Sequence, residues 1–235
     1  MESSKGSIIL VHGLWMPTLV MKWMARKLRQ RGWSTRNHHY STTRSTVAEN
    51  ADLLALFIRD QKLEGASIVA HSLGGVISVE MMRRHPDLNV GNLVALGSPF
   101  MGSWTAHRLL RWPFGRRWMG KSFPGGLDGS VQRTVPEGRS VGVIAGSMGV
   151  GISRLFLPGL PRPSDGTVSV AETVIPGRAD HVCVKTVHMG FLISSTVVDL
   201  SDHFLKKGRF PQYHRGYDPE LPRSCEFSRS DVTYG

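Results

Sequence analysis

The first 100 residues alternate between two patterns of apolar and polar positions. Short continuous apolar runs predict buried parallel strands, whereas apolar residues spaced three or four apart predict amphipathic helices. Such patterns predict strands at residues 7–12, 66–71 and 92–97 and helices at residues 21–31, 46–63 and 73–85. The more polar segment 34–40, between the first two helices, fits a further strand. Because strands and helices take turns along the chain, we expect an α/β fold in which a mostly parallel sheet is covered by helices on both faces.

The pattern changes after residue 100. Residues 100–138 are rich in Gly, Trp and Arg and follow neither periodicity, so this insert is a candidate cap. A strand is expected at residues 140–145, an irregular stretch at 149–163, further strands at 167–175 and 182–187, and a last helix at 190–207. We therefore expect a single domain over residues 1–210, with its cap insert at about residues 100–138, and a polar C-terminal tail over residues 211–235.

Length and composition are those of an ordinary globular protein. The chain has 235 residues, of which 40% are hydrophobic and 20% charged, and this is enough to bury a sizeable core. No apolar run approaches the ~18 residues of a membrane span, and the residues before the first strand leave no room for a signal peptide. The two cysteines, Cys183 and Cys225, lack the number and spacing of a disulfide framework or a metal site. We therefore expect a cytoplasmic protein, with peripheral attachment to a membrane as a second possibility.

The chain is strongly basic. Its 29 Lys and Arg residues outnumber its 18 Asp and Glu residues and give a formal net charge of +11. Such a charge attracts nucleic acid, anionic lipid or an acidic substrate. The basic residues are dispersed and form no nucleic-acid-binding motif, so nucleic acid is not an expected partner.

The segment AHSLGG at residues 70–75 lies between an expected strand and an expected helix, where it predicts a nucleophile elbow. In such an elbow the nucleophile occupies a strained turn that only small residues can flank two positions to either side. Ala70 and Gly74 meet this requirement. The turn would present the Ser72 hydroxyl at the carboxyl ends of the strands, where the active sites of open α/β sheets lie.

The segment HGL at residues 12–14, directly after the first strand, predicts an oxyanion loop. An acyl-transfer site needs two backbone N–H donors directed at the oxyanion, one from the residue after the nucleophile and one from a loop after an earlier strand. Leu73 and Leu14 occupy these two positions, and Gly13 would let the backbone bend close to the substrate.

The acid and the histidine of a catalytic triad follow the serine in that order in folds with this kind of elbow. Asp165 lies in a loop after the 140–145 strand, and His188 closes the 182–187 strand just before the last helix, so these are the expected acid and base. The competing bases are His181, His203 and His214, and the competing acids are Asp128 and Asp180.

The chain resembles the small bacterial lipases and esterases of the α/β-hydrolase superfamily at five motifs spread over residues 7–210, namely VHGLW, VAHSLGG, LVALGSP, SDGTVSVAET and VHMGFLISSTVVDLSDHFLKKGRF. The resemblance implies Ser72 as nucleophile, Asp165 and His188 as its partners, and the N–H groups of Leu14 and Leu73 as oxyanion donors. It also implies that no metal or organic cofactor takes part. The expected function is hydrolysis of carboxylic esters, with a small-molecule ester or a lipid as the substrate.

Two alternatives to an ester hydrolase stay open at this point. An ester, a thioester and an amide all pass through the same kind of tetrahedral species, so a thioesterase or an amidase would use the same residues. A protein of the same fold that binds a lipid or a small ligand without turnover is the alternative from a different class.

The cap insert interleaves aromatic and basic residues. Trp104, Trp112 and Trp118 alternate with arginines along it, which suits a lid facing lipid, although the same spacing is typical of a helix packed on its own domain. With Trp15 beside the oxyanion loop, these tryptophans are the candidate substrate-contacting and cap residues. An anionic membrane surface is accordingly a candidate partner.

Overall fold

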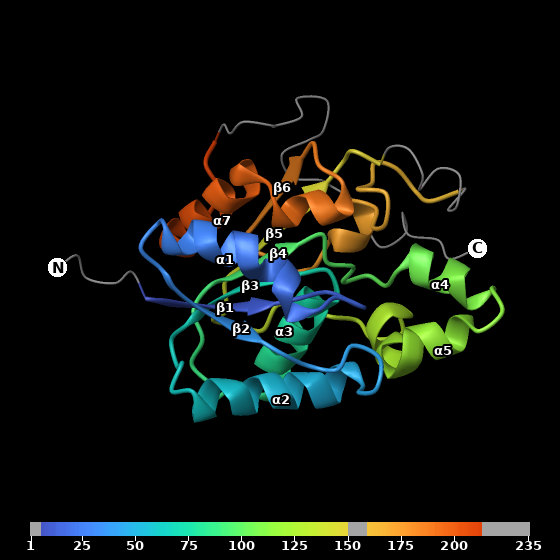
Figure 1. Ribbon diagram of the computed structural model, residues 1–235, viewed down its shortest axis with the longest axis horizontal. Coiled ribbons are helices and arrows are strands. Elements are labelled where there is room, and N and C mark those ends of the chain that lie inside the picture. The colour runs from blue at the N-terminus through green and yellow to red at the C-terminus, as the bar shows by residue number, and fades with distance from the viewer. Residues whose placement is uncertain (1–5, 150–158, 213–235) are drawn as a thin grey trace.

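Six parallel strands form one sheet in the computed structural model, which describes residues 6–149 and 159–212 (Figure 1). Their order in the sheet is β2-β1-β3-β4-β5-β6, and every neighbouring pair is parallel. The strands are β1 (Ser7–Val11), β2 (Ser34–His38), β3 (Ser67–His71), β4 (Leu93–Leu96), β5 (Val141–Gly146) and β6 (Asp180–Val184). The expected α/β fold with a parallel sheet is confirmed.

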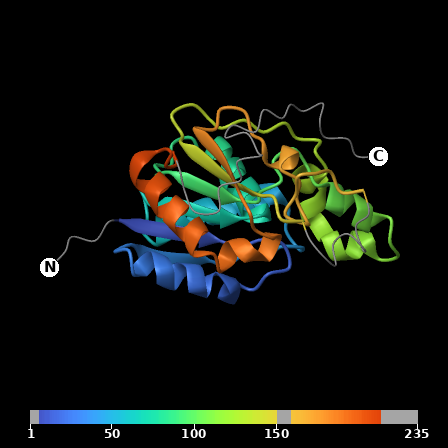
Figure 2. The ribbon, with the colours of Figure 1, turned by 90° about the horizontal axis from the view of Figure 1, so that it is seen from above.

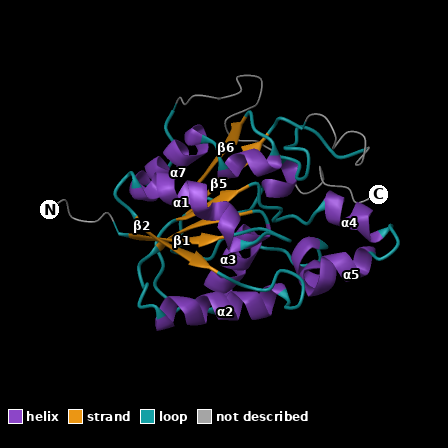
Figure 3. Ribbon diagram, viewed as in Figure 1, coloured by secondary structure: helices purple, strands orange, loops and turns teal. Residues whose placement is uncertain are grey.

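Helices cover both faces of the sheet (Figure 3). The first core cluster joins one face to α2 (Val47–Asp60) and α3 (Leu73–Arg84), and the second joins the other face to α1 (Lys22–Arg29) and α7 (Ser195–Lys207). Successive strand residues point to opposite faces, so Ile8 packs in the second cluster and Ile9 in the first. The inner strands β1, β3, β4 and β5 are largely apolar because helices cover both faces of the sheet there. The edge strand β2 has the polar sequence STRNH and is only partly buried.

Side-chain caps set the ends of the long helices. Thr46 accepts a hydrogen bond from the Glu49 backbone N–H and Glu49 accepts one from the Thr46 N–H, so α2 begins with a capping box. The Ser194 hydroxyl caps α7 by accepting a single hydrogen bond from the Val197 N–H, and Gly208 ends that helix in the left-handed conformation. Among the residues described, no helix combines the length and the apolar character needed to cross a membrane.

The insert after β4 forms a small cap at the carboxyl end of the sheet, and Figure 2 shows it in green at one end of the molecule. It contains the short helices α4 (Trp104–Leu110) and α5 (Gly115–Met119), followed by a 3₁₀ turn over Gly120–Ser122 and a π turn over Phe123–Leu127. The base of this cap is fastened to the loop after β2, because the Lys121 N–H donates to the Thr43 carbonyl at 2.8 Å.

The prediction of a strand at residues 167–175 is wrong. The segment is a loop that ends in a 3₁₀ turn over Ala171–Thr173. Val168 and Val170 are buried, as the apolar pattern requires, but the backbone turns because the Ser169 N–H and hydroxyl both donate to the Glu172 carboxyl. The SVAE sequence at residues 169–172 is a capping-box signal that points to this turn.

The boundaries of the last two elements also differ from expectation. Strand β6 begins two residues earlier than the predicted 182–187 strand and ends at Val184. The predicted helix over 190–207 is divided into a 3₁₀ turn over His188–Leu192 and α7, because Ile193 leaves the helical conformation before the Ser194 cap. Residues 150–158 of the expected irregular stretch and 213–235 of the expected tail lie outside the described residues.

The ring of Phe204 is fully buried on α7, where it packs against Phe210 with 4.8 Å between ring centroids. A Cβ added to Gly142 on β5 would lie 2.5 Å from this ring, so the ring fills the space that the glycine leaves. We expect Phe204→Ala to lower the free energy of unfolding by about 3–5 kcal/mol, as measured by urea denaturation. Leu56→Ala on α2 is the matched control, because Leu56 is 51% exposed. A similar loss in both variants would contradict this assignment of the core.

Candidate active site

Ser72 occupies a strained turn between β3 and α3. Its φ of 54° and ψ of −123° lie in a region that side-chain-bearing residues rarely adopt. The turn is held by hydrogen bonds from the Ser72 N–H to the Leu96 carbonyl at 2.8 Å and from the Gly75 N–H to the Ser72 carbonyl at 3.0 Å. The sharp turn expected at residues 70–75 is therefore present.

The glycine pair after Ser72 is required by close packing. A Cβ on Gly74 would lie 2.5 Å from the Val11 carbonyl oxygen, and one on Gly75 would lie 2.1 Å from the Ser98 hydroxyl. The first turn of α3 thus rests directly on the ends of β1 and β4, where only glycine fits.

The loop after β1 lies against this turn. A Cβ on Gly13 would be 3.0 Å from the Cβ of Ser72, and Leu14 lines the same pocket as Ser72 and Leu73. This close approach accounts for the glycine at position 13, which was expected from the sequence.

Tyr40 supports that loop, although the sequence analysis did not single it out. Its hydroxyl donates to the His12 carbonyl at 2.5 Å, and its ring stacks on the His12 ring with 4.4 Å between centroids. Tyr40 is buried two residues after the end of β2, the strand that pairs with β1. The sequence shows only a tyrosine at the end of the predicted 34–40 strand, which does not reveal a tertiary hydrogen bond.

Asp165 and His188 form a direct pair. The Asp165 Oδ2 and the His188 Nδ1 are 2.6 Å apart, and the His188 backbone N–H donates to the Asp165 carbonyl at 2.9 Å. The other carboxylate oxygen, Oδ1, accepts from the N–H groups of Thr167 at 2.9 Å and Val168 at 2.7 Å. The buried carboxylate is therefore fixed in orientation and directs His188.

The competing acids have other partners. The Asp128 carboxylate accepts hydrogen bonds from Gly125 and Ser130 within the cap, and the Asp180 carboxylate accepts from the backbone N–H groups of His181 and Phe210. Of the competing bases, the His181 ring contacts the Thr173 hydroxyl, His203 lies within α7, and His214 is outside the described residues.

Gly97, at the end of β4, makes room for the Asp165–His188 pair. Its φ is +54°, and an added Cβ would lie 2.9 Å from the Asp165 Oδ2 and 3.3 Å from the His188 Nδ1.

A second imidazole, that of His71, lies beside His188. It is fully buried, and burial lowers its pKa well below the usual range. His71 is therefore neutral, and its Nε2–H donates to the His188 carbonyl at 3.1 Å.

Ser72 and His188 line one pocket of about 260 Å³ beneath the cap. Most of its other walls are apolar and come from the loop after β1, the cap and the loop that contains Asp165, including Leu14, Met16, Leu109, Met119, Leu127 and Val168. Of the four tryptophans that the sequence suggested, Trp15 lines this pocket, whereas Trp104, Trp112 and Trp118 are not among its lining residues. Helix α4 instead presents Thr105, Ala106 and Leu109 to the pocket. Within the described part of the chain, no group of three or more His, Cys, Asp or Glu side chains is arranged to hold a metal ion.

Comparison with known families identifies the class of this protein. A family model described as "Putative serine esterase (DUF676)" matches residues 2–122. The chain belongs to this serine esterase family. It is therefore an ester hydrolase. A search of curated proteins found no match to its sequence.

Solved structures show that the esterase has the α/β-hydrolase fold. The mature lipase BlEst2 from Bacillus licheniformis is 18% identical with a TM-score of 0.71, and the match covers 88% of this chain and 93% of that chain. The carboxylesterase CesB (YbfK) from Bacillus subtilis is 15% identical with a TM-score of 0.56, covering 86% and 84%. The NocB thioesterase domain from the nocardicin cluster is 18% identical with a TM-score of 0.55, covering 87% and 96%. These low identities support the shared fold and do not identify a substrate.

Glu172 joins the segment that follows Asp165 to the cap of the esterase. The fully buried carboxyl accepts hydrogen bonds from the Trp104 N–H at the start of α4 and from the N–H and hydroxyl of Ser169 at 2.6 and 2.9 Å. Burial is the main cause that raises the pKa of Glu172 to about 7, and the nearby Asp165 charge acts in the same direction. The capping-box sequence gives a signal for the contact with Ser169, but the contact with the cap has no sequence signal.

The raised pKa of Glu172 predicts a pH-dependent stability. In the unfolded chain the carboxyl titrates near 4.5, so the stability that its neutral form contributes is full below that pH and is lost as the pH rises through about 7. The side chain of Glu172→Gln is always neutral. We therefore expect its Tm to fall less than that of the parent esterase as the pH rises from 4.5 to 7. Thermal melts followed by circular dichroism measure this difference. The exposed Glu137→Gln should follow the parent, and equal slopes for Glu172→Gln and the parent would contradict the prediction.

Proposed function

We propose that this esterase hydrolyses lipid-like carboxylic esters through an acyl-enzyme on Ser72, with His188 as general base and Asp165 as orienting acid. The observation that carries the proposal is the 2.6 Å contact between Asp165 and His188 at the wall of the pocket that also contains Ser72. A carboxylate bound at Nδ1 keeps the proton on that nitrogen, which leaves Nε2 as the proton acceptor.

In the acylation step the Ser72 Oγ attacks the ester carbonyl carbon while the His188 Nε2 takes the hydroxyl proton. The carbonyl oxygen becomes an oxyanion that the backbone N–H groups of Leu14 and Leu73 would stabilise, and one such donor is commonly worth ~3–4 kcal/mol of barrier. The intermediate then collapses, the bond to the alkoxy oxygen breaks, and that oxygen receives the proton from His188. The products of this step are a free alcohol and an acyl group bound to Ser72.

Deacylation repeats the sequence with water as the nucleophile. The His188 Nε2 accepts a proton from the water as its oxygen attacks the acyl carbon, and then returns the proton to the Ser72 Oγ as the acid leaves. Asp165 does not itself take up the proton, because its function is to orient the imidazole and to stabilise the transient imidazolium.

The pocket walls support an acyl chain of limited length as the substrate group. They are largely aliphatic, and a volume of about 260 Å³ suits a short or medium hydrocarbon chain better than a large polar group. A lipid-like ester would place its carbonyl at Ser72 and its chain along Leu109 and Met119 beneath the cap.

Substitution of the three proposed catalytic residues tests this mechanism. We expect Ser72→Ala and His188→Ala to abolish turnover of p-nitrophenyl butyrate and octanoate with little loss of Tm, because they remove the nucleophile or the base. Asp165→Asn should lower kcat by about 10⁴, because the histidine would then favour the wrong tautomer. Asp180→Asn is the matched control, since the Asp180 carboxylate accepts hydrogen bonds from the backbone N–H groups of His181 and Phe210. A larger loss in Asp180→Asn than in Asp165→Asn would reassign the acid.

The surface of the cap supports a second part of the proposal, in which the cap rests on an anionic lipid surface. Trp112, Phe114 and Trp118 are 44%, 74% and 47% exposed. Residues 100–127 contain four arginines and one lysine but no Asp or Glu. Exposed aromatic side chains favour the boundary between water and lipid, and the basic residues favour anionic headgroups.

Vesicle binding tests the cap surface. We expect the protein to bind anionic phospholipid vesicles more tightly than neutral ones, with a blue shift of tryptophan emission that salt weakens. Replacing Arg111, Arg116 and Arg117 together by Gln should reduce this binding and the hydrolysis of long-chain esters, but not that of p-nitrophenyl butyrate. A variant with Lys22, Arg26 and Lys27 of α1 replaced by Gln loses the same charge elsewhere and should bind nearly as the parent does. Equal losses in the two variants would show that net charge, and not the cap, governs binding.

A further inference from the structure

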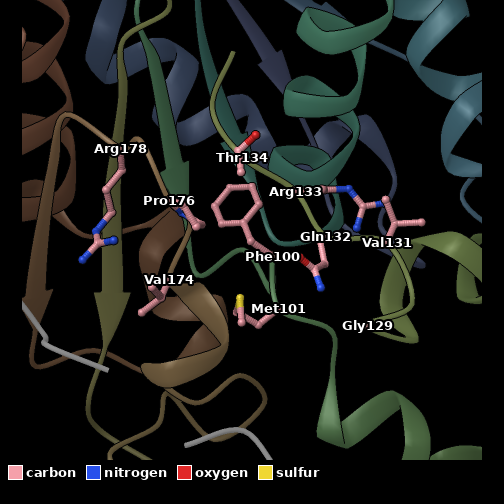
Figure 4. Close-up of a pocket in the computed structure, with 10 residues that line it drawn as sticks. All are labelled: Phe100, Met101, Gly129, Val131, Gln132, Arg133, Thr134, Val174, Pro176 and Arg178. Atoms are coloured by element: carbon pink, nitrogen blue, oxygen red, sulfur yellow. The ribbon is translucent and has the colours of Figure 1, made fainter. Parts of the chain in front are cut away.

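A second pocket lies outside the proposed catalytic site (Figure 4). It has a volume of about 370 Å³ and lies between residues 100–101 after β4, residues 129–134 in the last part of the cap insert, and residues 174–178 before β6. None of its lining residues lines the pocket of Ser72. A pocket of this size is within the range of ~300–1,000 Å³ in which proteins hold small ligands.

The walls of this second pocket are mainly hydrocarbon. Phe100, Met101, Val131, Val174 and Pro176 contribute them, and the Phe100 ring lies at the centre of the view in Figure 4. The polar groups among the remaining lining residues include the side chains of Gln132 and Thr134. Such walls favour a ligand with an apolar body, because binding removes apolar surface from water on both partners.

The charged residues that line the pocket are both arginines. Figure 4 shows Arg133 and Arg178 on opposite sides of Phe100, and no Asp or Glu is among the lining residues of the described chain. Arg178 is partly exposed, and one of its Nη atoms donates to the Ile175 carbonyl at 3.1 Å. A guanidinium has five N–H donors, so Arg178 has further donors that an anion could accept from.

Arg133 adds a buried positive charge. It is 4% exposed, its Nη atoms donate to the carbonyls of Gly125 and Gly126, and its Nε has no acceptor in the described part of the chain. The negative charges of Glu80 and Asp128 attract this guanidinium without forming a direct ion pair with it. Glu80 instead pairs with Arg83 at 2.6 Å. A buried cation without a direct carboxylate partner is unfavourable, and an anion bound nearby would offset this.

We propose that this pocket binds an amphiphilic carboxylate, with its hydrocarbon chain over Phe100 and Val174 and its carboxylate beside Arg178. The ligand would be selected by walls that are mainly apolar and include two arginines, with no Asp or Glu among the lining residues of the described chain. The free acids that an ester hydrolase releases belong to this chemical class. The site does not depend on the roles proposed for Ser72, Asp165 and His188.

Photo-crosslinking with an octanoate analogue that carries a diazirine on its chain locates the site, and mass spectrometry maps the labels. We expect labels on residues 129–134 and 174–178, in the parent and in Ser72→Ala alike. Labels confined to the wall of the Ser72 pocket, such as Leu14 or Leu109, would overturn the proposal. Because octanoate is not an ester, this result is independent of whether Ser72 is the nucleophile.

Calorimetric titration with octanoate, octanol and octylammonium tests the charge preference. We expect octanoate to bind at least tenfold more tightly than octanol, and octylammonium to bind least, because hydrogen bonds between a carboxylate and arginine are stronger than those of a neutral hydroxyl. Equal binding of octanoate and octanol would overturn the role of the arginines.

Variants connect the binding to the pocket. Arg178→Gln should weaken octanoate binding about tenfold, Arg178→Lys should weaken it less, and the exposed Arg36→Gln on β2 should not change it. Val174→Trp should block the site by filling it while both arginines remain. Equal affinity of Arg178→Gln and the parent would refute the proposal even if Val174→Trp fails to fold.

Discussion

The close approach of three backbone segments at Ser72 is the constraint on which the rest of this site depends. A side-chain-bearing residue at φ 54° costs on the order of 1–3 kcal/mol and persists only where its surroundings hold it. Here the start of α3 lies so close to the Val11 carbonyl and the Ser98 side chain that a Cβ on Gly74 or Gly75 would overlap them. The burial of α3 between the sheet and α2 thus supplies the energy that keeps the Ser72 hydroxyl at the end of the sheet.

The parallel sheet brings the remaining groups to the same edge. The loops that carry Asp165 and His188 lie at the carboxyl ends of the strands, and each meets a neighbouring strand through a glycine. A Cβ on Gly146, the last residue of β5, would lie 2.7 Å from the Asp165 Cβ, just as one on Gly97 would touch the carboxylate. The Asp165–His188 contact therefore depends on the absence of side chains at two strand ends, as well as on the two residues themselves.

Much of this arrangement could be predicted from the sequence because it follows from local chemistry. Strands buried on both faces appear as continuous apolar runs, and the elbow at Ser72 has a steric requirement that is visible in six residues. The segment 167–175 was mistaken for a strand because buried valines two residues apart occur both in strands and in turns, and only the side-chain bonds of Ser169 and Glu172 distinguish them. The contact of Tyr40 with His12 and that of Glu172 with Trp104 join residues distant in the chain, so no local pattern reveals them.

Other contacts between residues distant in the chain link the cap to the two loops that carry the proposed chemistry. On one side, the Trp15 indole N–H, next to the proposed donor Leu14, bonds to the Trp118 carbonyl on the cap at 2.8 Å. On the other side, the Thr105 hydroxyl of α4 bonds to the Thr167 carbonyl at 2.5 Å, two residues after Asp165, and Glu172 accepts from the Trp104 N–H. A substrate that displaces the cap must strain or break these hydrogen bonds, and the same bonds hold the loops beneath it. Room for a bulky ester and the geometry around Ser72 are consequently coupled, because both depend on the same contacts between the cap and the loops.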